Sequence, residues 1–208
     1  PFSVPNAEQV ELSYDKRNSI IASSRSALIE AVHNDVIKAW VPSSYEKVAT
    51  TGSSVAAHQA SATGNRKKVT LADILAVKKL FDKNNIPQND RCFLLDYEMH
   101  NAFLSTADAA KGTDGQLYGF DFYMRSDVLR VVAAGTSLAT EAAASDSAAG
   151  LAWQKDCVSI AQGESELFEE QKSPLYYSDV FSMLVRAGGS HVRYDGKGVV
   201  VLYQATQG

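Results

Sequence analysis

The stretch that most constrains this fold lies near the end of the chain, where residues 175–204 read LYYSDVFSMLVRAGGSHVRYDGKGVVVLYQ. Residues 199–203 form a β-branched and aromatic run, which is typical of a strand. A shorter run, residues 192–194, precedes the pair Asp195-Gly196, and glycine accepts the positive φ of a tight reversal. We therefore predict a hairpin that turns at Asp195-Gly196.

The first half of this stretch is ambiguous. A helical stripe would use Val180, Phe181, Leu184 and Val185, whereas a strand face would use Phe181, Met183 and Val185. We favour the strand, with Gly188-Gly189 as a bulge or bend in a long antiparallel ribbon. A continuous helix through Gly188 would contradict this interpretation.

Composition narrows the class of protein. With 208 residues, 45% of them hydrophobic, the chain can bury a core without disulfides. A formal net charge of −4 does not suggest the basic footprint of a nucleic-acid-binding protein. The sequence lacks both an apolar run of roughly 20 residues and the layout of a signal peptide, so we expect a cytoplasmic protein without membrane contact. The first residue is Pro1 and not Met, which suggests processing or trimming.

The longest predicted helix covers residues 15–40 and ends before Pro42. Its apolar stripe recurs every three to four residues, at Ile21, Leu28, Val32, Val36 and Trp40. Residues 1–13 suit an edge strand or an extended arm.

Further elements follow from capping and apolar patterns. Thr70 and Asp73 outline a capping box that opens a helix, and residues 84–87 end it. Residues 91–95 predict a buried strand, after which Asp96 starts a second helix. Residues 117–124 and 128–132 predict two more strands, with Gly119 as a bulge or close approach. Residues 151–161 predict a short helix or a turn and strand.

Three segments are expected to be exposed. Residues 49–65 are rich in Gly, Ala, Ser and Thr and predict a mobile loop, and residues 133–150 predict an insertion that is mobile unless another subunit orders it. The basic run at residues 66–68 is interpreted as a solvated loop in preference to a DNA contact. The acidic residues 164–170 would face solvent or the basic residues of a neighbour.

No group of residues forms a convincing catalytic site. Asp96, Glu98 and His100 come nearest, because helical spacing puts Asp96 and His100 on one side, where they could share a metal or a proton. We favour Asp96 as a helix cap. Cys92 and Cys157 are far apart and predict two buried thiols, although Cys157 with His100 or His191 leaves a cysteine nucleophile as an alternative. We assign no catalytic, cofactor-binding or metal-binding residue, and no cofactor.

The order of the pieces resembles a known family. A long helix closes with KAW, and residues 69–104 read VTLADILAVKKLFDKNNIPQNDRCFLLDYEMHNAFL. GQLYGFDFYM, LAWQKDCVSIAQ and the terminal stretch follow in turn. Nearly the whole chain resembles the major capsid (coat) proteins of tailed bacteriophages, which have the Hong-Kong-97-like fold.

The resemblance implies an α+β fold in two regions. Residues 1–65 and 171–208 would form a peripheral-like domain, in which the spine helix, residues 15–40, lies against an antiparallel sheet that the strands within residues 180–203 join. Residues 66–170 would form a mixed α/β axial-like domain. The N-terminal arm and extended loop of the family are not found before the helix, so we assign no residue to the Lys–Asn cross-link of some relatives.

The resemblance also implies a function. The chain would be a structural subunit of a bacteriophage or prophage capsid, not an enzyme, which assembles with copies of itself into hexamers and pentamers around the DNA genome. A scaffolding protein and a maturation protease would be further partners, with only non-specific contact to packaged DNA. Its location would be the virion, after assembly in the host cytoplasm. The alternatives are another phage head or tail structural protein, and a cysteine-dependent hydrolase that uses Cys157.

Overall fold

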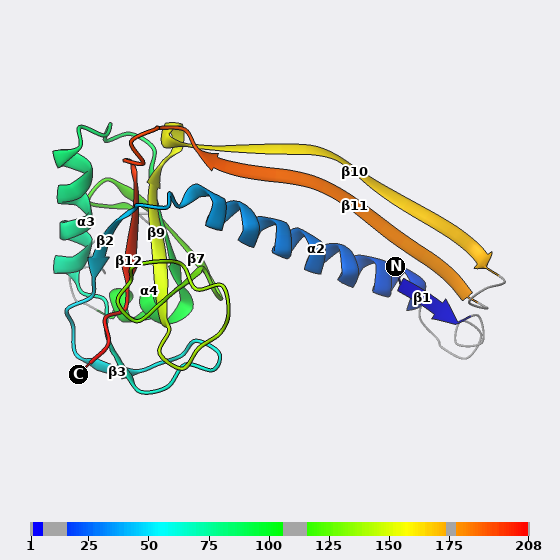
Figure 1. Ribbon diagram of the computed structural model, residues 1–208, viewed down its shortest axis with the longest axis horizontal. Helices are drawn as coiled ribbons and strands as arrows, with labels where there is room; N and C mark the ends of the chain where they lie inside the picture. Colours follow the sequence, from blue (N-terminus) through cyan, green and yellow to red (C-terminus); the bar gives the residue numbers. More distant parts are fainter. Residues whose placement is uncertain (1, 6–15, 106–115, 174–177, 208) are drawn as a thin grey trace. The chain divides into compact units, whose positions relative to one another are not determined.

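The computed structural model describes residues 2–5, 16–105, 116–173 and 178–207 (Figure 1). The chain divides into two compact units, each made of two stretches of sequence. Unit 1 comprises Pro1–Val36 and Ile160–Gly188, and unit 2 comprises Ile37–Ser159 and Gly189–Gly208. These bounds do not coincide with those of the two regions expected from the sequence. We describe each unit by itself.

Unit 1 pairs one long helix with a narrow sheet. The helix α2 spans Lys16–Trp40, which confirms the predicted helix over its described residues. The sheet has the order β1-β11-β10, with β1 at Phe2–Pro5, β11 at Ser178–His191 and β10 at Val158–Ser173. The edge strand β1 runs antiparallel to β11, so the predicted edge strand is confirmed for residues 2–5, while residues 6–13 lie outside the described residues.

Unit 2 contains a seven-stranded sheet in the order β2-β12-β9-β5-β7-β6, with β8 paired to β9 beside this path. The strands are β2 Glu46–Ala49, β5 Arg91–Asp96, β6 Gln116–Leu117, β7 Phe120–Arg125, β8 Leu129–Val131, β9 Ser147–Gln154 and β12 Val199–Tyr203. The pairs β12–β2 and β5–β7 are parallel, whereas β9 is antiparallel to β12, β5 and β8. The sheet of unit 2 is therefore mixed, with both parallel and antiparallel pairs.

Two helices and several short elements complete unit 2. The helix α3 spans Leu71–Lys83 and α4 spans Tyr97–Leu104. The Asp73 carboxylate accepts a hydrogen bond of 2.8 Å from the Thr70 N–H, which confirms the predicted capping box, and Asn84 follows the helix as its C-cap. A small hairpin joins β3 Ser54–Ala56 to β4 Asn65–Lys67, and Lys155–Cys157 form a 3-10 turn between β9 and β10.

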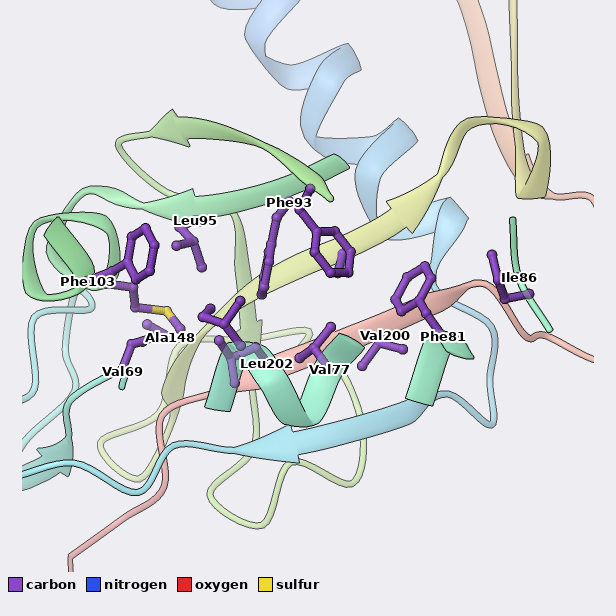
Figure 2. Close-up of a cluster of buried hydrophobic side chains, with 14 of the residues drawn as sticks. Val69, Val77, Phe81, Ile86, Phe93, Leu95, Phe103, Ala148, Val200 and Leu202 are labelled. Carbon is purple, nitrogen blue, oxygen red and sulfur yellow. The ribbon is translucent and has the colours of Figure 1, made fainter. Parts of the chain in front are cut away.

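The core of unit 2 lies on both faces of its sheet. Side chains alternate along each strand, so Phe93 and Leu95 join one apolar cluster while Leu94 joins the other. Figure 2 shows the first cluster, in which Phe81 from α3 and Phe103 from α4 approach the strand residues. The alternation explains why β5 is buried along its whole length.

The predicted terminal hairpin is wrong in its pairing. The turn itself exists, since the Gly196 N–H donates to the Arg193 carbonyl at 3.0 Å and Gly196 has φ +65°. However, β12 pairs with β2 and β9, while β11 pairs with β10 and β1 in a different sheet. The expected single sheet for residues 180–203 is therefore not formed. The choice of a strand over a helix for residues 180–190 is confirmed, because β11 runs through Gly188.

The prediction of a mobile insertion at residues 133–150 is also wrong for the last residues of that segment. Residues 147–150 belong to β9, a buried strand between β12 and β5 in the sheet. A Cβ on Gly150 would lie 2.7 Å from Leu95 Cδ2 and 2.9 Å from the Leu94 carbonyl oxygen. A small residue is needed at this position because the neighbouring strand β5 approaches closely, so the small residues at 147–150 mark tight packing, while residues 140–145 are exposed.

Two smaller expectations are corrected. Gly119 is not a bulge: Tyr118 and Gly119, with φ +55° and +82°, form the two-residue turn between β6 and β7. Residues 49–65 are not one loop, because they contain β3 and the start of β4. The predicted strand at 128–132 is confirmed as β8.

Candidate functional site

The strongest catalytic candidate from the sequence proves to be structural. Asp96 is fully buried, and its Oδ1 accepts a hydrogen bond of 2.8 Å from the Met99 N–H at the start of α4. This confirms Asp96 as the helix cap. His100 lies farther along the same helix, where burial lowers its pKa. Among the described residues, no group of three or more His, Cys, Asp or Glu side chains could hold a metal ion.

The partner of Asp96 is a histidine that sequence reasoning missed. Its Oδ2 lies 2.8 Å from His58 Nε2, across 38 residues of sequence, and the His58 ring meets Tyr97 edge-on at 5.4 Å. Burial lowers the pKa of His58, but the hydrogen bond and charge of Asp96, together with Glu98 and Asp127, outweigh burial and raise it. The pair fastens the segment after β3 to the start of α4. No local sequence pattern links two residues so far apart.

The two cysteines have the properties of core residues. Cys92 and Cys157 are both buried free thiols, as predicted. Burial raises the pKa of the Cys157 thiol, whereas a nucleophilic cysteine needs a lowered one. The charged groups that act on this thiol are Arg193, Asp156 and Asp195, and neither His100 nor His191 is among them. The geometry therefore gives the hydrolase alternative no support.

The interpretation of residues 66–68 as a solvated loop is wrong for Arg66. Arg66 is only 3% exposed, and its guanidinium donates to Ser147 Oγ at 3.0 Å and to the Asp146 carbonyl at 2.7 Å. It joins β4 to the beginning of β9. Because a buried arginine is retained only where its donors are satisfied, Arg66 holds the fold together and is not a solvated contact.

Unit 1 contains a groove with a largely apolar lining. This groove of about 300 Å³ separates α2 from the ribbon β10–β11. Its apolar lining comes from both sides and includes Ile21, Leu28, Ile29, Val32, Met183 and Val185. Polar groups also line it, among them Arg25 and His33 on α2 and Gln162 and Glu166 on β10. We call this space the α2 groove.

Unit 1 leaves much of its apolar surface uncovered. Among the buried hydrophobic residues of the described chain, only Val36 and Phe181 belong to unit 1. Ile160, Leu167 and Phe168 on the ribbon are 56%, 49% and 53% exposed. Ile160 and Leu167 also line the α2 groove, and exposed apolar surface beside a groove is typical of protein–protein contact. The candidate functional site is therefore an interaction surface.

Comparison with known proteins supplies the fold class. No family model matches the chain, and no curated protein does. A structure of Mycobacterium phage Che8 is similar with a TM-score of 0.67 at 17% identity, over 97% of this chain and 68% of that one. The capsid structure of the cyanophage P-SCSP1u is similar with a TM-score of 0.64 at 16% identity, over 99% of this chain and 71% of that one. The capsid of Ralstonia phage GP4 is similar with a TM-score of 0.63 at 11% identity, over 100% of this chain and 72% of that one.

These likenesses define the class of fold: the chain has the fold of phage capsid proteins. More particularly, its long helix and its sheets match the Hong-Kong-97-like form that the sequence predicted.

Proposed function

We propose that this protein is a structural subunit of a bacteriophage or prophage capsid, which assembles with copies of itself into the hexamers and pentamers of a shell around the DNA genome. The observation that carries the proposal is the likeness in fold to solved phage capsids over 97% to 100% of the chain. A likeness of this extent includes both units, so it does not reflect one common supersecondary motif.

The open surface of unit 1 supports the same proposal. A helix with an apolar stripe normally buries that stripe, yet most apolar residues that line the α2 groove are only partly covered. Burying them against another chain would remove apolar area from water at about 25 cal/mol per Å². A subunit that completes its packing during assembly has this property.

The units suggest separate roles in the shell. We assign unit 1, with the spine helix α2, to the peripheral-like region, and unit 2, with its mixed sheet, to the axial-like region around the hexamer and pentamer axes. A scaffolding protein and a maturation protease would act during assembly in the host cytoplasm, and the mature location would be the virion. The formal charge of −4 fits a shell that encloses DNA without many phosphate contacts.

No membrane partner is part of the proposal. None of the helices described here is both long and apolar enough to cross a membrane.

Electron microscopy of the purified protein, expressed with the other head proteins of its phage, tests the proposal. The expected result is closed shells or rings. The copy number in purified virions separates a shell subunit, present in hundreds of copies, from a head-completion or tail protein. A protein that stays monomeric, or that occurs in only a few copies per virion, would contradict the proposal.

A further inference from the structure

The turn at residues 192–198 carries the most exposed large hydrophobic side chain among the described residues. Tyr194 is fully exposed, and Val192 beside it is 58% exposed. An aromatic side chain offers a large apolar area at little cost in conformational entropy, so aromatic anchors are common at the centres of interfaces. We call residues 192–198 the Tyr194 turn.

The backbone on both sides of Tyr194 is held rigidly. The Arg193 guanidinium donates two hydrogen bonds to the Asp195 carboxylate, at 3.1 and 2.8 Å. The same carboxylate accepts from the Lys197 N–H at 3.1 Å, and the Val192 N–H donates to the Cys157 carbonyl at 2.8 Å. Gly198 packs directly against the Cys157 thiol. The turn therefore holds the backbone of Tyr194 in one preformed position, which lowers the entropic cost of binding.

The α2 groove matches a tyrosine in size and chemistry. At about 300 Å³ it lies at the low end of the roughly 300–1,000 Å³ range of ligand pockets, so it suits one aromatic side chain better than a cofactor. Leu28, Val32 and Met183 supply an apolar wall for the ring. Gln162 and Ser165 lie at the same groove and provide partners for the hydroxyl, which a buried tyrosine requires.

The charges beside the two surfaces are also complementary. The exposed part of β10 carries Glu164, Glu166 and Glu170; Glu166 lines the groove on the β10 side, and Arg25 lines it on the α2 side. The Tyr194 turn carries an exposed Lys197, while its Asp195 is already paired with Arg193. A lysine next to the anchor would thus meet an acidic strand, which favours this orientation of the two surfaces.

We propose that Tyr194 of one copy inserts into the α2 groove of a second copy of this chain. The inference rests on the proposed function, because it names one of the contacts by which the subunits assemble. The two surfaces lie on different parts of the chain, so the contact is heterologous: each copy offers a turn to one neighbour and a groove to another. Contacts of this kind close into rings when the rotation between copies permits.

Disulfide trapping between two separately substituted chains tests the contact. One chain carries Tyr194→Cys and the other Gln162→Cys in the α2 groove. The matched control replaces Ala161, the exposed neighbour of Gln162 on the opposite side of β10, by Cys. Because Cys92 and Cys157 are buried, they should not compete. The proposal expects several-fold more covalent dimer from the Tyr194–Gln162 mixture than from the Tyr194–Ala161 mixture.

Substitution of the anchor gives an independent measurement. Tyr194→Ala should raise the subunit concentration needed for assembly by on the order of 30-fold, as loss of an interface anchor does. Tyr194→Phe should have a smaller effect, because it removes only the hydroxyl. The thermal stability of the dissociated subunit should stay the same, since the Tyr194 side chain is fully exposed.

The outcomes separate the two proposals. Assembly of the natural chain together with equal trapping at residues 161 and 162 would overturn the contact and leave the capsid function standing. Unchanged assembly of the Tyr194→Ala chain would likewise overturn the contact and leave the capsid function standing. A natural chain that forms neither rings nor shells would overturn the capsid function, and with it the contact.

Discussion

The two units differ in how they bury apolar surface. Unit 2 packs Phe93, Leu95 and their neighbours on one face of its sheet and a second cluster on the other face. Unit 1 fully buries only Val36 and Phe181 among its described hydrophobic residues, and its helix and ribbon leave the α2 groove between them. The difference indicates that unit 2 is stabilised by its own core, whereas unit 1 leaves apolar surface available for contact with another chain.

The largest expected effect is in the core of unit 2. Phe93→Ala should lower the free energy of unfolding by about 3–5 kcal/mol, because Phe93 is fully buried and stacks on Phe122 at 5.4 Å. Urea denaturation, monitored by circular dichroism, measures this loss in the free energy of unfolding. The control is Tyr123→Ala, which removes an aromatic ring that is 49% exposed from the adjacent strand β7. Equal losses from the two variants would show that this cluster is not the stabilising core.

A second substitution tests the close packing of β9. Gly150→Ala should cost about 1–3 kcal/mol, because the added Cβ would lie 2.9 Å from a backbone carbonyl oxygen that cannot move freely. Gly188→Ala in β11 is the matched control, since a Cβ there meets no atom within 4 Å. Thermal denaturation of both variants gives the comparison. If Gly150→Ala were tolerated as well as Gly188→Ala, the tight approach of β9 to β5 would be refuted.

A smaller effect is expected in unit 1. Leu28→Ala should lower the stability of the dissociated subunit by about 1 kcal/mol or less, because the side chain is only partly covered. The same variant should weaken assembly clearly, since the groove loses apolar surface. Sedimentation across a concentration series measures the second effect, and Ser23→Ala on an exposed part of α2 is the control. A loss of stability as large as that of Phe93→Ala would remove the contrast between the units.

The smallest expected effect depends on pH. Because Asp96 raises the pKa of His58 in the folded protein, the stabilisation from this pair should be fully present below the ordinary histidine pKa of about 6.5. It should be lost as the pH rises through the folded-state pKa. Denaturation of the natural chain and of His58→Gln at several pH values measures the stabilisation that the His58–Asp96 pair contributes at each pH. In Asp96→Asn, which keeps a capping oxygen but no charge, the loss of stability with rising pH should become smaller or reverse, because burial then opposes only Glu98 and Asp127. A stabilisation that grew with pH would contradict the assignment.

Local chemistry made several elements predictable. The apolar stripe of α2, the Thr70–Asp73 capping box and the cap at Asp96 each depend on residues a few positions apart. The resemblance of ordered pieces to phage capsid proteins was likewise confirmed at the level of the fold. The candidate site was less predictable, because the α2 groove combines side chains from α2, β10 and β11.

The sequence by itself determined the helix α2, the strands β5, β8 and β12, where α3 and α4 begin, and that the two cysteines are buried. Only the tertiary structure decided that β12 pairs with β2 and β9, that the small-residue strand β9 lies inside the sheet, and that Arg66 and His58 have buried partners. The physical reason is distance along the chain. Capping and periodicity act within a few residues, whereas strand partners and buried polar pairs depend on which distant segment fits the available space.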